Sequence, residues 1–539
     1  MNFQKSRTIT VVFDFDHTLF STKNFYRVLK ENFKKLGVEE ELFNNSFEES
    51  KGKGRDYKPK RQFRLIHKAK PKIKIKDLQV CFKRILKEAP RFVYEDVIWF
   101  LKKWQNKINL ILLSYGEQRF QRVKISSSKI EKYFKKIIVT KDINKTKPLK
   151  KIFKKHEKIV VIEDNPNALL EIKKNYPYAI TVRINRGEGK YKDLLTDKRI
   201  DFSIRNLKEL SEILKKIQKK PKTLLLFSGG LDSMLAAKIL MEQNIKVKGI
   251  TFKSYFFDAE QAKISAKEIN LPIKIIDFSQ EHLAIVKKPK YGYGKGANPC
   301  IDCHILMLKK AKEFARKHGF DFVSTGEVLG ERPMSQNKKS LKLIEEQSSL
   351  KGYLLRPLSA KLLEPSIPER LRWVDRARLL DISGKGRKRQ IQLAKEYKIK
   401  TYPSPGGGCL LTDLEFSKRL KELLKIYPQF QENDIQLLKV GRHFWQRFQS
   451  KQRKASQAKW AKIIVGRNEK ENKKIKRLSQ KGDVLIEMRN YPGPLSLIRS
   501  YPKGEISKEI LEKTKKLTQY YSPKARNKKD VVFKIWRVQ

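Results

Sequence analysis

Short apolar runs recur along the first three quarters of the chain, and each run ends in polar or glycine-rich residues. Clear examples are residues 9–13, 110–113, 159–162 and 223–227. Short apolar runs bounded by turn residues are typical of buried parallel strands, and stretches with helical periodicity separate them here. The pattern therefore predicts α/β architecture with parallel sheets. Beyond about residue 433 the pattern changes to short strands and basic helices, which predicts a small α+β unit.

The length of the chain predicts a multidomain protein, because 539 residues correspond to three or four domains at about 150 residues each. We expect a Rossmann-like α/β domain over 1–205, with a mostly helical cap inserted at about 20–105. A lysine-rich helical linker is expected over 206–222. A second parallel-sheet domain with a helical extension is expected over 223–432, and the small basic α+β domain over 433–539.

A glycine-rich turn follows the apolar run at 223–227 and precedes a helical stretch. The backbone N–H groups of such a turn converge on one point, and the dipole of the next helix adds positive potential, so the turn suits a phosphate group. The turn resembles the SGGxDS loop of the PP-loop ATP pyrophosphatases. The resemblance implies an ATP site formed by Ser228, Gly229, Gly230, Asp232 and Ser233.

The cysteines are few, and their placement is informative. Four cysteines in 539 residues exclude a fold built on disulfides. Cys81 stands alone, Cys300 and Cys303 form a C-x-x-C pair, and Cys409 follows a run of glycines. Loops rich in glycine or proline let a thiolate approach its substrate closely. The pair and Cys409 are therefore candidates for sulfur chemistry.

Three segments around these cysteines resemble tRNA thiouridine synthases. Residues 298–303, N-P-x-x-x-C ending at Cys303, are similar to the segment of tRNA 2-thiouridylases that carries their first catalytic cysteine. Residues 325–330 and 356–358 are similar to segments of tRNA 4-thiouridine synthetases. The resemblance implies ATP-dependent thiolation of a tRNA uridine, with Gly326 at the ATP site.

The implied reaction begins with adenylation of the uridine carbonyl oxygen, after which sulfur displaces AMP. The sulfur donor is a persulfide made by a cysteine desulfurase, or sulfide. Two mechanisms remain open. In one, Cys303 carries a persulfide and Cys409 resolves it as a disulfide. In the other, Cys300, Cys303 and Cys409 hold a [4Fe–4S] cluster with one iron open to hydrosulfide, and the additional cysteine at position 300 narrowly favours this mechanism.

Two further roles for the cysteine pair deserve comparison. Cys300-x-x-Cys303-His304 also matches the c-type haem attachment pattern, but that attachment occurs on the exported side of a membrane, and the chain opens without a signal-peptide core. A structural zinc on Cys300, Cys303, His304 and Cys409 has suitable ligand types. We favour it less, because these residues surround the nucleotide loop instead of forming an independent knuckle.

The first α/β domain carries a separate set of polar residues at the ends of its apolar runs. The first run leads into Asp-x-Asp-x-Thr, the second into a serine and the third into Glu-Asp, with a Lys-x-Lys pair before the third. One carboxylate can attack a phosphoryl group while a second moves the proton, and Ser and Lys can neutralise phosphate oxygens. This order of residues resembles the HAD superfamily of hydrolases.

The HAD resemblance implies a Mg²⁺-dependent phosphohydrolase and gives each polar residue a role. Asp14 is the nucleophile and Asp16 the general acid/base. Carboxylates are suitable Mg²⁺ ligands. The metal ligands implied are Asp14, Asp16 and Asp164, with Glu163 nearby, and the phosphate ligands are Ser114 and Lys147, or Lys145 in place of Lys147.

The charge of the chain favours a polyanionic partner. Lys and Arg number 122 against 58 Asp and Glu, which gives a formal net charge of +64. Such a field attracts nucleic acid, although lysine is spread over nearly every segment. Residues 51–80 are especially basic and form either a solvated insertion or an RNA-facing arm. Together with the thiolase motifs, the charge predicts tRNA as the partner.

The C-terminal segment resembles the small RNA-binding domain of the NFACT family. The resemblance depends on residues 463–468, Asn472 and residues 491–495. It implies that RNA docks on this segment, and an unrelated basic α+β module is the alternative.

The chain lacks an apolar run near 18 residues, so we expect no membrane span, and the few cysteines predict a cytoplasmic protein. The function predicted is thus tRNA thiolation with an appended phosphohydrolase. Two alternatives remain. One is a PP-loop ligase or sulfurtransferase that acts on a small molecule. The other is a non-catalytic RNA-binding scaffold.

Overall fold

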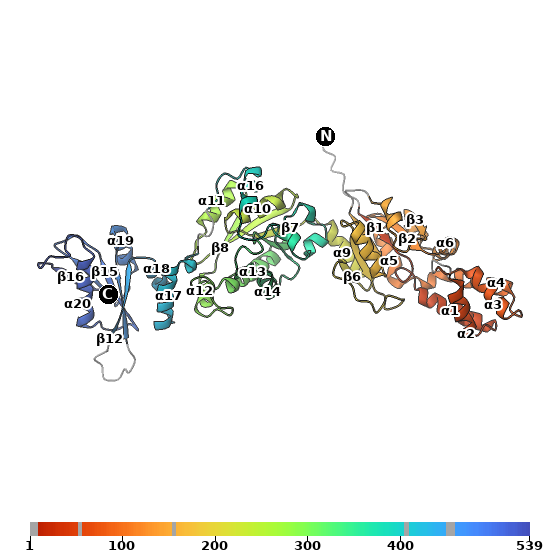
Figure 1. Ribbon diagram of the computed structural model, residues 1–539, viewed down its shortest axis with the longest axis horizontal. Coiled ribbons are helices and arrows are strands. Elements are labelled where there is room, and N and C mark those ends of the chain that lie inside the picture. Colours follow the sequence, from red (N-terminus) through yellow and green to blue (C-terminus); the bar gives the residue numbers. More distant parts are fainter. Residues whose placement is uncertain (1–8, 52–55, 154–157, 404–408, 449–458) are drawn as a thin grey trace. The chain divides into compact units, whose positions relative to one another are not determined.

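The computed structural model describes residues 9–539 except 52–55, 154–157, 404–408 and 449–458. The glycine run at 406–408, which we expect to precede a reactive cysteine, therefore lies outside the described residues. The chain divides into two compact units, each described here by itself (Figure 1). The first comprises Met1–Lys220 and Ile367–Val374, and the second comprises Pro221–Ser366 and Asp375–Gln539.

The first unit is built on a six-stranded parallel sheet in the order β3-β2-β1-β4-β5-β6. The strands are β1 Thr10–Phe13, β2 Asn109–Tyr115, β3 Lys136–Thr140, β4 Ile159–Glu163, β5 Ile180–Ile184 and β6 Phe202–Ile204. The strand order reverses at β1, which lies between β2 and β4. Ligands of open α/β sheets bind outside the carboxyl ends of the strands at such a reversal. The predicted carboxylates follow or end β1 and β4 and Ser114 lies near the end of β2, whereas Lys145 and Lys147 follow β3.

The helices of the first unit form two groups: one group makes a separate cap, and the other covers the sheet. The cap helices are α1 Thr22–Lys35, α2 Glu40–Ser50, α3 Pro59–Ala69 and α4 Ile75–Lys87, and the sheet helices are α5 Glu95–Trp104, α6 Gln118–Ser127, α7 Thr146–Lys150, α8 Pro166–Asn175 and α9 Leu207–Gln218. Phenylalanine and tyrosine rings pack edge to face through the cap, for example Phe25 on Phe82 and Phe92. This aromatic core explains why a lysine-rich segment folds.

Two segments belong to the first unit although the sequence predicts them outside the first domain, one as a linker and one in the second domain. The predicted linker forms α9, whose Leu210 and Leu214 are buried, and Trp104 of α5 donates to Ser211 of α9 at 3.1 Å. Residues 367–374 contain α15 Ile367–Arg370 and are bound to the unit by arginines. Arg370 donates to the carbonyl of Ile200 at 2.9 Å.

The second unit opens with a five-stranded parallel sheet in the order β11-β10-β7-β8-β9. The strands are β7 Lys222–Leu226, β8 Lys246–Lys253, β9 Ile273–Asp277, β10 Phe322–Thr325 and β11 Leu354–Leu355. The helices that follow are α10 Leu231–Met241, α11 Glu260–Glu268, α12 Ser279–Lys287, α13 Cys300–Lys317, α14 Lys338–Gln347 and α16 Lys388–Glu396. The strand order reverses at β7, between β10 and β8. The predicted nucleotide turn therefore emerges at the reversal, beside the end of β10.

The chain then forms an antiparallel sheet in the order β12-β13-β15-β14-β16. Its strands are β12 Arg442–Phe448, β13 Lys459–Val465, β14 Val484–Met488, β15 Ser496–Tyr501 and β16 Phe533–Arg537, accompanied by α19 Glu469–Leu478 and α20 Lys508–Tyr520. One sheet face packs Ile463, Ile486 and Ile498 with Ile510 of α20. The other packs Ile464 and Leu497 with Ile475 of α19.

Two helices precede this sheet, α17 Leu414–Ile426 and α18 Glu432–Leu438. The boundary expected at 432/433 falls inside α18. Asp434 of α18 accepts hydrogen bonds from Arg499 at 2.9 Å and Tyr501 at 2.6 Å, both on β15. These buried bonds hold α18 on the antiparallel sheet.

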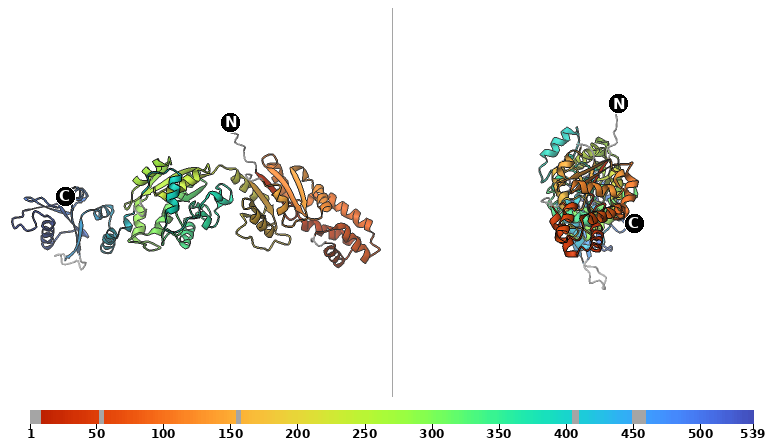
Figure 2. Two further views of the ribbon diagram at one scale, coloured as in Figure 1. Left: turned by 45° about the horizontal axis from the view of Figure 1, so that its top comes forward. Right: turned by 90° about the vertical axis from the view of Figure 1, so that its right-hand side faces the viewer.

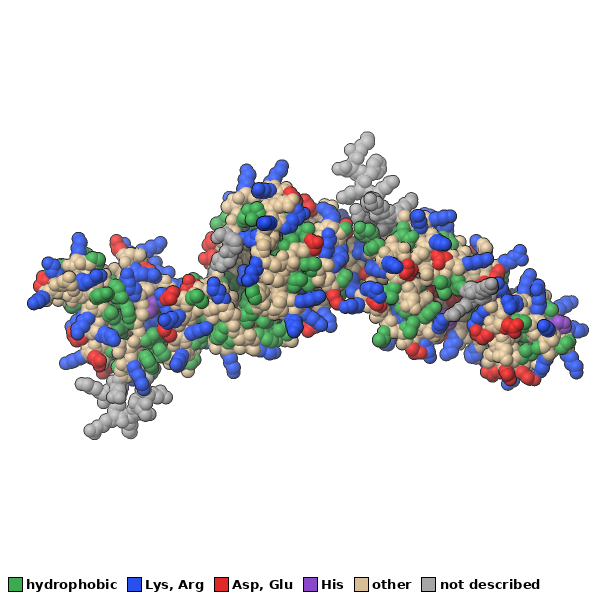
Figure 3. Space-filling model, viewed as in Figure 1, with side chains coloured by type: hydrophobic (Ala, Val, Ile, Leu, Met, Phe, Trp, Pro, Cys, Tyr) green, Lys and Arg blue, Asp and Glu red, His purple; other side chains and the backbone are tan. Residues whose placement is uncertain are grey.

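The predicted fold class is confirmed: the protein is an α/β multidomain chain with two parallel sheets and a C-terminal antiparallel sheet (Figure 2). Space-filling representation shows Lys and Arg side chains over every part of the visible face (Figure 3). Charge alone therefore does not select one RNA-binding surface. Among the described helices, none combines the length and apolar character that crossing a membrane requires.

Candidate active sites

Three carboxylates meet at the reversal point of the first parallel sheet. Asp14 follows β1, Glu163 ends β4 and Asp164 comes next, and one oxygen from each lies within 4.8 Å of the others. The amide of Asp14 donates to the carbonyl of Ile162 at 2.9 Å, which sets the two strand ends side by side. Three convergent carboxylate oxygens are suitable ligands for Mg²⁺. In the described part of the chain, no other set of His, Cys, Asp or Glu side chains converges so closely.

One lysine neutralises this carboxylate group. Lys145 is buried, and its ammonium binds both Asp14 and Glu163, the latter at 2.5 Å. Lys145 is the cap of α7 and has a left-handed backbone with φ of 56°, a conformation that costs energy for a side chain with Cβ. Lys147, placed on the phosphate in the sequence interpretation, is exposed. The structure thus brings the alternative lysine, Lys145, to the carboxylates, because the short α7 turns Lys147 outward.

Asp16 stands apart from the three carboxylates. Its oxygens accept hydrogen bonds from Lys124, Thr22 and Gln121, so its carboxylate does not join the group expected to hold metal. Lys124 is buried, and burial favours the pairing because an isolated ammonium would be costly there. Gln121 also donates to Ser114 at 3.1 Å, which links the predicted serine to Asp16. No sequence pattern points to Lys124 or Gln121 beyond their spacing on α6.

The pKa values of the two predicted HAD aspartates are shifted in opposite directions. Burial, then the neighbouring Glu163, raises the pKa of Asp14 to about 7, and Lys145 only partly opposes this. Burial would also raise the pKa of Asp16, but the charge and hydrogen bond of Lys124 outweigh burial and lower it. Burial and Glu163 raise the pKa of Asp164 well above its usual value. A divalent cation would compensate this excess of negative charge.

The glycine turn of the second unit forms a tight phosphate-type loop between β7 and α10. Gly229 has φ of 80°, and a Cβ there would lie 2.6 Å from the backbone of Ala262. Ser233 donates to the carbonyl of Gly230 at 2.7 Å, and the hydroxyl of Ser228 accepts from the amide of Gly230 at 3.3 Å. These bonds shape the turn, and Gly230 caps α10 with its helix N-terminus facing the turn.

Gly326 follows β10 and touches the same helix start. A Cβ on Gly326 would lie 2.6 Å from the backbone nitrogen of Ser233. Only glycine permits the two segments to approach so closely. The structure thus brings together all six residues predicted to bind ATP, which are Ser228, Gly229, Gly230, Asp232, Ser233 and Gly326.

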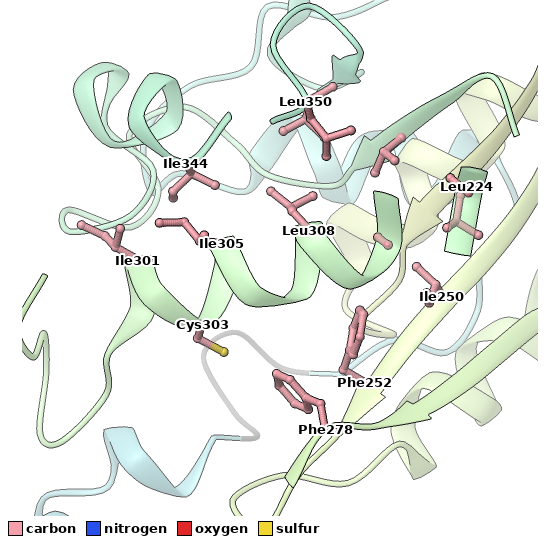
Figure 4. Close-up of a cluster of buried hydrophobic side chains, with 14 residues drawn as sticks. Leu224, Ile250, Phe252, Phe278, Ile301, Cys303, Ile305, Leu308, Ile344 and Leu350 are labelled. Atoms are coloured by element: carbon pink, nitrogen blue, oxygen red, sulfur yellow. The ribbon is translucent and has the colours of Figure 1, made fainter. Parts of the chain in front are cut away.

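Cys300 and Cys303 lie on the first turn of α13 and contact different groups. Cys303 projects from the opposite side of α13 to Ile305, on the side of Phe278 (Figure 4). Cys300 donates its S–H to the hydroxyl of Ser335 at 3.1 Å and shares a hydrogen bond with His304. Residues 300 and 304 are four apart on a helix and therefore share one face.

His304 is held by a chain of buried charges. Its Nδ1 lies 2.8 Å from a carboxylate oxygen of Glu327, and Arg356 donates to the other oxygen of Glu327 at 2.9 Å. Thr325 donates to that second oxygen at 3.0 Å. Each buried charge is paired, as burial requires. The chain Cys300–His304–Glu327–Arg356 joins α13 to the segments after β10 and β11.

The contacts from His304 give Cys300 a lower pKa than the other two cysteines. Burial alone would raise the pKa of Cys300, but its hydrogen bond with His304 and the charge of His304 lower it to about 7. Burial and the neighbouring thiols raise the pKa of Cys303 well above its usual value, and burial raises that of Cys409 to about 11. Against burial, Cys300 and Glu327 raise the pKa of His304 to about 10. Cys300 is therefore the thiol that ionises near neutral pH.

Cys409 is brought toward α13 by backbone contacts. The amide of Ala297, just before α13, donates to the carbonyl of Leu411 at 2.9 Å and to the hydroxyl of Ser417 at 3.1 Å. Cys300 influences the pKa of Cys409, so the three thiols form one electrostatic group. Their sulfurs, with His304, do not converge as a single-ion site among the described residues. The zinc alternative thus gains no support, because a tetrahedral zinc needs closer ligands.

Family comparisons divide the chain into three matching segments. Residues 11–170 match the haloacid dehalogenase-like hydrolase family, residues 218–362 match the thiamine biosynthesis protein (ThiI) family, and residues 453–539 match the NFACT protein RNA binding domain. The three resemblances inferred from motifs are confirmed by these matches. The chain is a fusion of a HAD-type, a PP-loop and an NFACT-type domain.

Curated relatives match the PP-loop part. The tRNA-specific 2-thiouridylase MnmA of Petrotoga mobilis is 28% identical over 249 residues, covering 41% of this chain and 64% of the relative. The enzyme of the same name from Clostridioides difficile is 27% identical over 223 residues, covering 37% and 58%. The chain therefore spans less than two thirds of these relatives.

Solved structures match the first part of the chain. A haloacid dehalogenase-like family hydrolase from Xanthomonas campestris has a TM-score of 0.29 and 15% identity, covering 39% of this chain and 96% of that structure.

Proposed function

We propose that the protein is an ATP-dependent tRNA uridine thiolase with an appended Mg²⁺-dependent phosphohydrolase. The thiolase proposal depends on one observation. The row of hydrogen-bonded side chains Cys300–His304–Glu327–Arg356 lowers the pKa of a thiol beside a PP-loop. The named function of the 2-thiouridylase relatives and the C-terminal RNA-binding match support tRNA as the substrate.

The PP-loop activates the base. ATP lies with its phosphates on the turn at Ser228–Ser233 and the start of α10. The uridine carbonyl oxygen attacks the α-phosphorus, the bond to the β-phosphate breaks, and pyrophosphate leaves. The base then carries AMP on its oxygen, which makes a poor leaving group a good one. Backbone N–H groups and the helix dipole stabilise the charge that develops on the phosphates.

Cys300 is the thiolate that accepts sulfur in this proposal. A persulfide donor transfers its outer sulfur to the Cys300 thiolate, releasing the donor thiol. The terminal sulfur of Cys300 attacks the activated carbon, and AMP departs. A second thiol, Cys409 or Cys303, then attacks the inner sulfur and forms a disulfide, leaving the outer sulfur on the base. An external dithiol must reduce that disulfide before the next turnover.

The persulfide scheme drawn from sequence gave the first role to Cys303. The charges around the thiols support Cys300 instead, because His304 faces Cys300 and the pKa of Cys303 is raised. The alternative is a [4Fe–4S] cluster on Cys300, Cys303 and Cys409, whose three thiols form one electrostatic group. Such a cluster would supply an iron that binds sulfide.

The HAD-type domain hydrolyses a phosphomonoester in this proposal. Asp14 attacks phosphorus, and Asp14, Glu163 and Asp164 are the residues that would hold Mg²⁺, which would lower the negative charge of the site. Lys145 holds the attacking carboxylate in place. Asp16 donates a proton to the leaving oxygen and then takes one from the water that hydrolyses the phosphate on Asp14, and Lys124 with Gln121 orients Asp16.

The experiment for the thiolase is reconstitution with the full chain, unmodified tRNA transcript, ATP, a dithiol and a persulfide donor. We expect release of AMP and pyrophosphate and a uridine in which sulfur replaces one oxygen. The experiment is run with iron-free protein in air and with anaerobically purified protein. Activity only in the iron-containing protein would transfer the sulfur-binding role to the cluster.

A further inference from the structure

Four buried polar atoms beside the nucleotide turn lack a hydrogen bond of ordinary geometry among the described residues, although Gln390 lies close enough to Asp232 to lower its pKa. They are Oδ1 of Asp232, Nε of Arg387 and the two amide atoms of Gln390. The Gln390 side chain is 1% exposed. Buried polar atoms are nearly always bonded in proteins, so a cluster of such atoms marks a place where a polar ligand fits.

The fold fixes these groups close to the PP-loop. The segment before α16 is tied to the strand ends, because the amide of Gly384 donates to the carbonyl of Leu329 at 2.7 Å. Helix α16 packs against α10 (Figure 1). Arg387 caps α16, and Asp232 lies in the first turn of α10. Two helix N-termini, each favourable to an anion, therefore face the same place.

The charges around Asp232 are consistent with this placement. Burial raises the pKa of Asp232, and Arg387, Gln390 and Arg332 act against burial. Arg332 also acts on Cys300 and Cys409. Its backbone amide is bound to Gln336 at 3.0 Å, and its side chain is exposed. Ser335, three residues after Arg332, contacts Cys300, and Leu329, three residues before it, is bonded to Gly384 ahead of α16, so Arg332 lies on the segment that joins the cysteines to the Arg387 region.

We propose that Arg387 with Gln390 binds the terminal phosphates of a nucleoside triphosphate, and that Arg332 binds the α-phosphate on the side of the cysteines. The assignment depends on the proposed function for its ligand, ATP. A P-loop lysine is absent from this turn, and two guanidinium groups supply the positive charge that such a lysine would provide. Arg387 remains on the departing pyrophosphate, while Arg332 remains on the adenylated base until sulfur displaces AMP.

The test compares binding of ATP, pyrophosphate and AMP to the full chain, without tRNA. We expect Arg387→Gln to weaken ATP and pyrophosphate binding about tenfold or more and to leave AMP binding unchanged, because a charge-assisted pair to phosphate is lost. Arg387→Lys should give an intermediate loss. Arg332→Gln should leave ATP and pyrophosphate binding within about threefold and slow tRNA-dependent AMP formation about 100-fold.

The matched control is Arg389→Gln, on the same helix but exposed and paired with Glu396. It should leave all three affinities unchanged. Wild-type affinity of Arg387→Gln for ATP and pyrophosphate would overturn the proposal, and so would an equal loss for AMP. Because these affinities need neither tRNA nor sulfur, they are independent of whether the protein thiolates RNA. A failure of thiolation with intact Arg387-dependent pyrophosphate binding would overturn the proposed function alone.

Discussion

The two candidate active sites control charge in opposite ways. In the first unit, three carboxylates crowd around one lysine, and burial with mutual repulsion raises the pKa of Asp14 to about 7. In the second unit, the Cys300 thiol is paired with the imidazole of His304, and Glu327 with Arg356 holds that imidazole. The pairing lowers the pKa of Cys300 to about 7. The first arrangement has negative charge for a metal ion to neutralise. The second creates a nucleophile without one.

The difference implies that the two sites work independently and respond to different changes. The largest effect is expected from Asp14→Asn, which should lower phosphomonoester hydrolysis by about 10⁴-fold or more, because an amide cannot replace the attacking carboxylate. Hydrolysis of a generic aryl phosphate with Mg²⁺ measures this. Thiolation should be unchanged. Lys147→Gln is the control and should stay within about twofold of wild type, since Lys147 is exposed. Hydrolysis that survives in Asp14→Asn would remove the nucleophile assignment.

Cys300→Ser should lower thiolation about 10³-fold and leave phosphomonoester hydrolysis and ATP-dependent pyrophosphate release intact, because the hydroxyl does not carry sulfur. Single-turnover assays that separate pyrophosphate release from thionucleoside formation measure this. Thiolation that depends on Cys303 but not on Cys300 would contradict the role given to His304 and restore the scheme drawn from sequence.

Gly229→Ala should slow ATP cleavage about 100-fold, because the new Cβ would lie 2.6 Å from the Ala262 backbone and displace the phosphate loop. Gly384→Ala is a matched control, since the space around Gly384 is open although its φ is also positive. Equal losses in the two variants would show that backbone strain, and not the contact with α11, is responsible. Pyrophosphate release is the measurement.

His304→Gln should shift the pH dependence of Cys300 reactivity. In the wild type, alkylation should rise through a midpoint of about 7 and level off, because the thiolate forms there while His304 stays protonated to about 10. Without the imidazolium the midpoint should move to higher pH, and Cys303 and Cys409 should remain slow. Mass spectrometry of alkylated peptides measures each thiol. An unchanged midpoint would show that His304 does not lower the pKa.

The smallest effect is expected from Cys81→Ala. Cys81 is buried in α4, and its pKa is raised by burial. Loss of its sulfur should lower the free energy of unfolding by about 1 kcal/mol and leave both activities unchanged. Chemical denaturation and the two assays measure this. A loss of thiolation in Cys81→Ala would mean that the sulfur chemistry is not confined to the second unit.

Much of the first site could be predicted from sequence, because its carboxylates follow or end apolar strands. Asp14 and Asp164 come after strands whose register brings their carboxyl ends together. The choice between Lys145 and Lys147 could not be made, since it depends on the left-handed backbone at Lys145. Lys124 and Gln121 were also missed, because a helix face carries no sign of which carboxylate it will meet.

The second site was harder to predict. The ATP turn and the cysteines are local motifs, but the His304–Glu327–Arg356 chain joins three segments far apart in the sequence. Its one local signal is the helical spacing of Cys300 and His304. Arg387 and Gln390 gave no signal, because their position depends on how α16 packs against α10. The contacts that tie Asp434 of α18 to the last sheet likewise join residues far apart in the sequence.

The proposed reaction places sulfur on a tRNA uridine by way of an adenylated base. It can be tested by mass spectrometry of the nucleosides from an unmodified tRNA transcript after reaction with the full chain, ATP, a dithiol and a persulfide donor. We expect one thiouridine per AMP released, and no thiouridine with Cys300→Ser. ATP cleavage to AMP without any thionucleoside, under both iron-free and anaerobic iron-containing conditions, would contradict it.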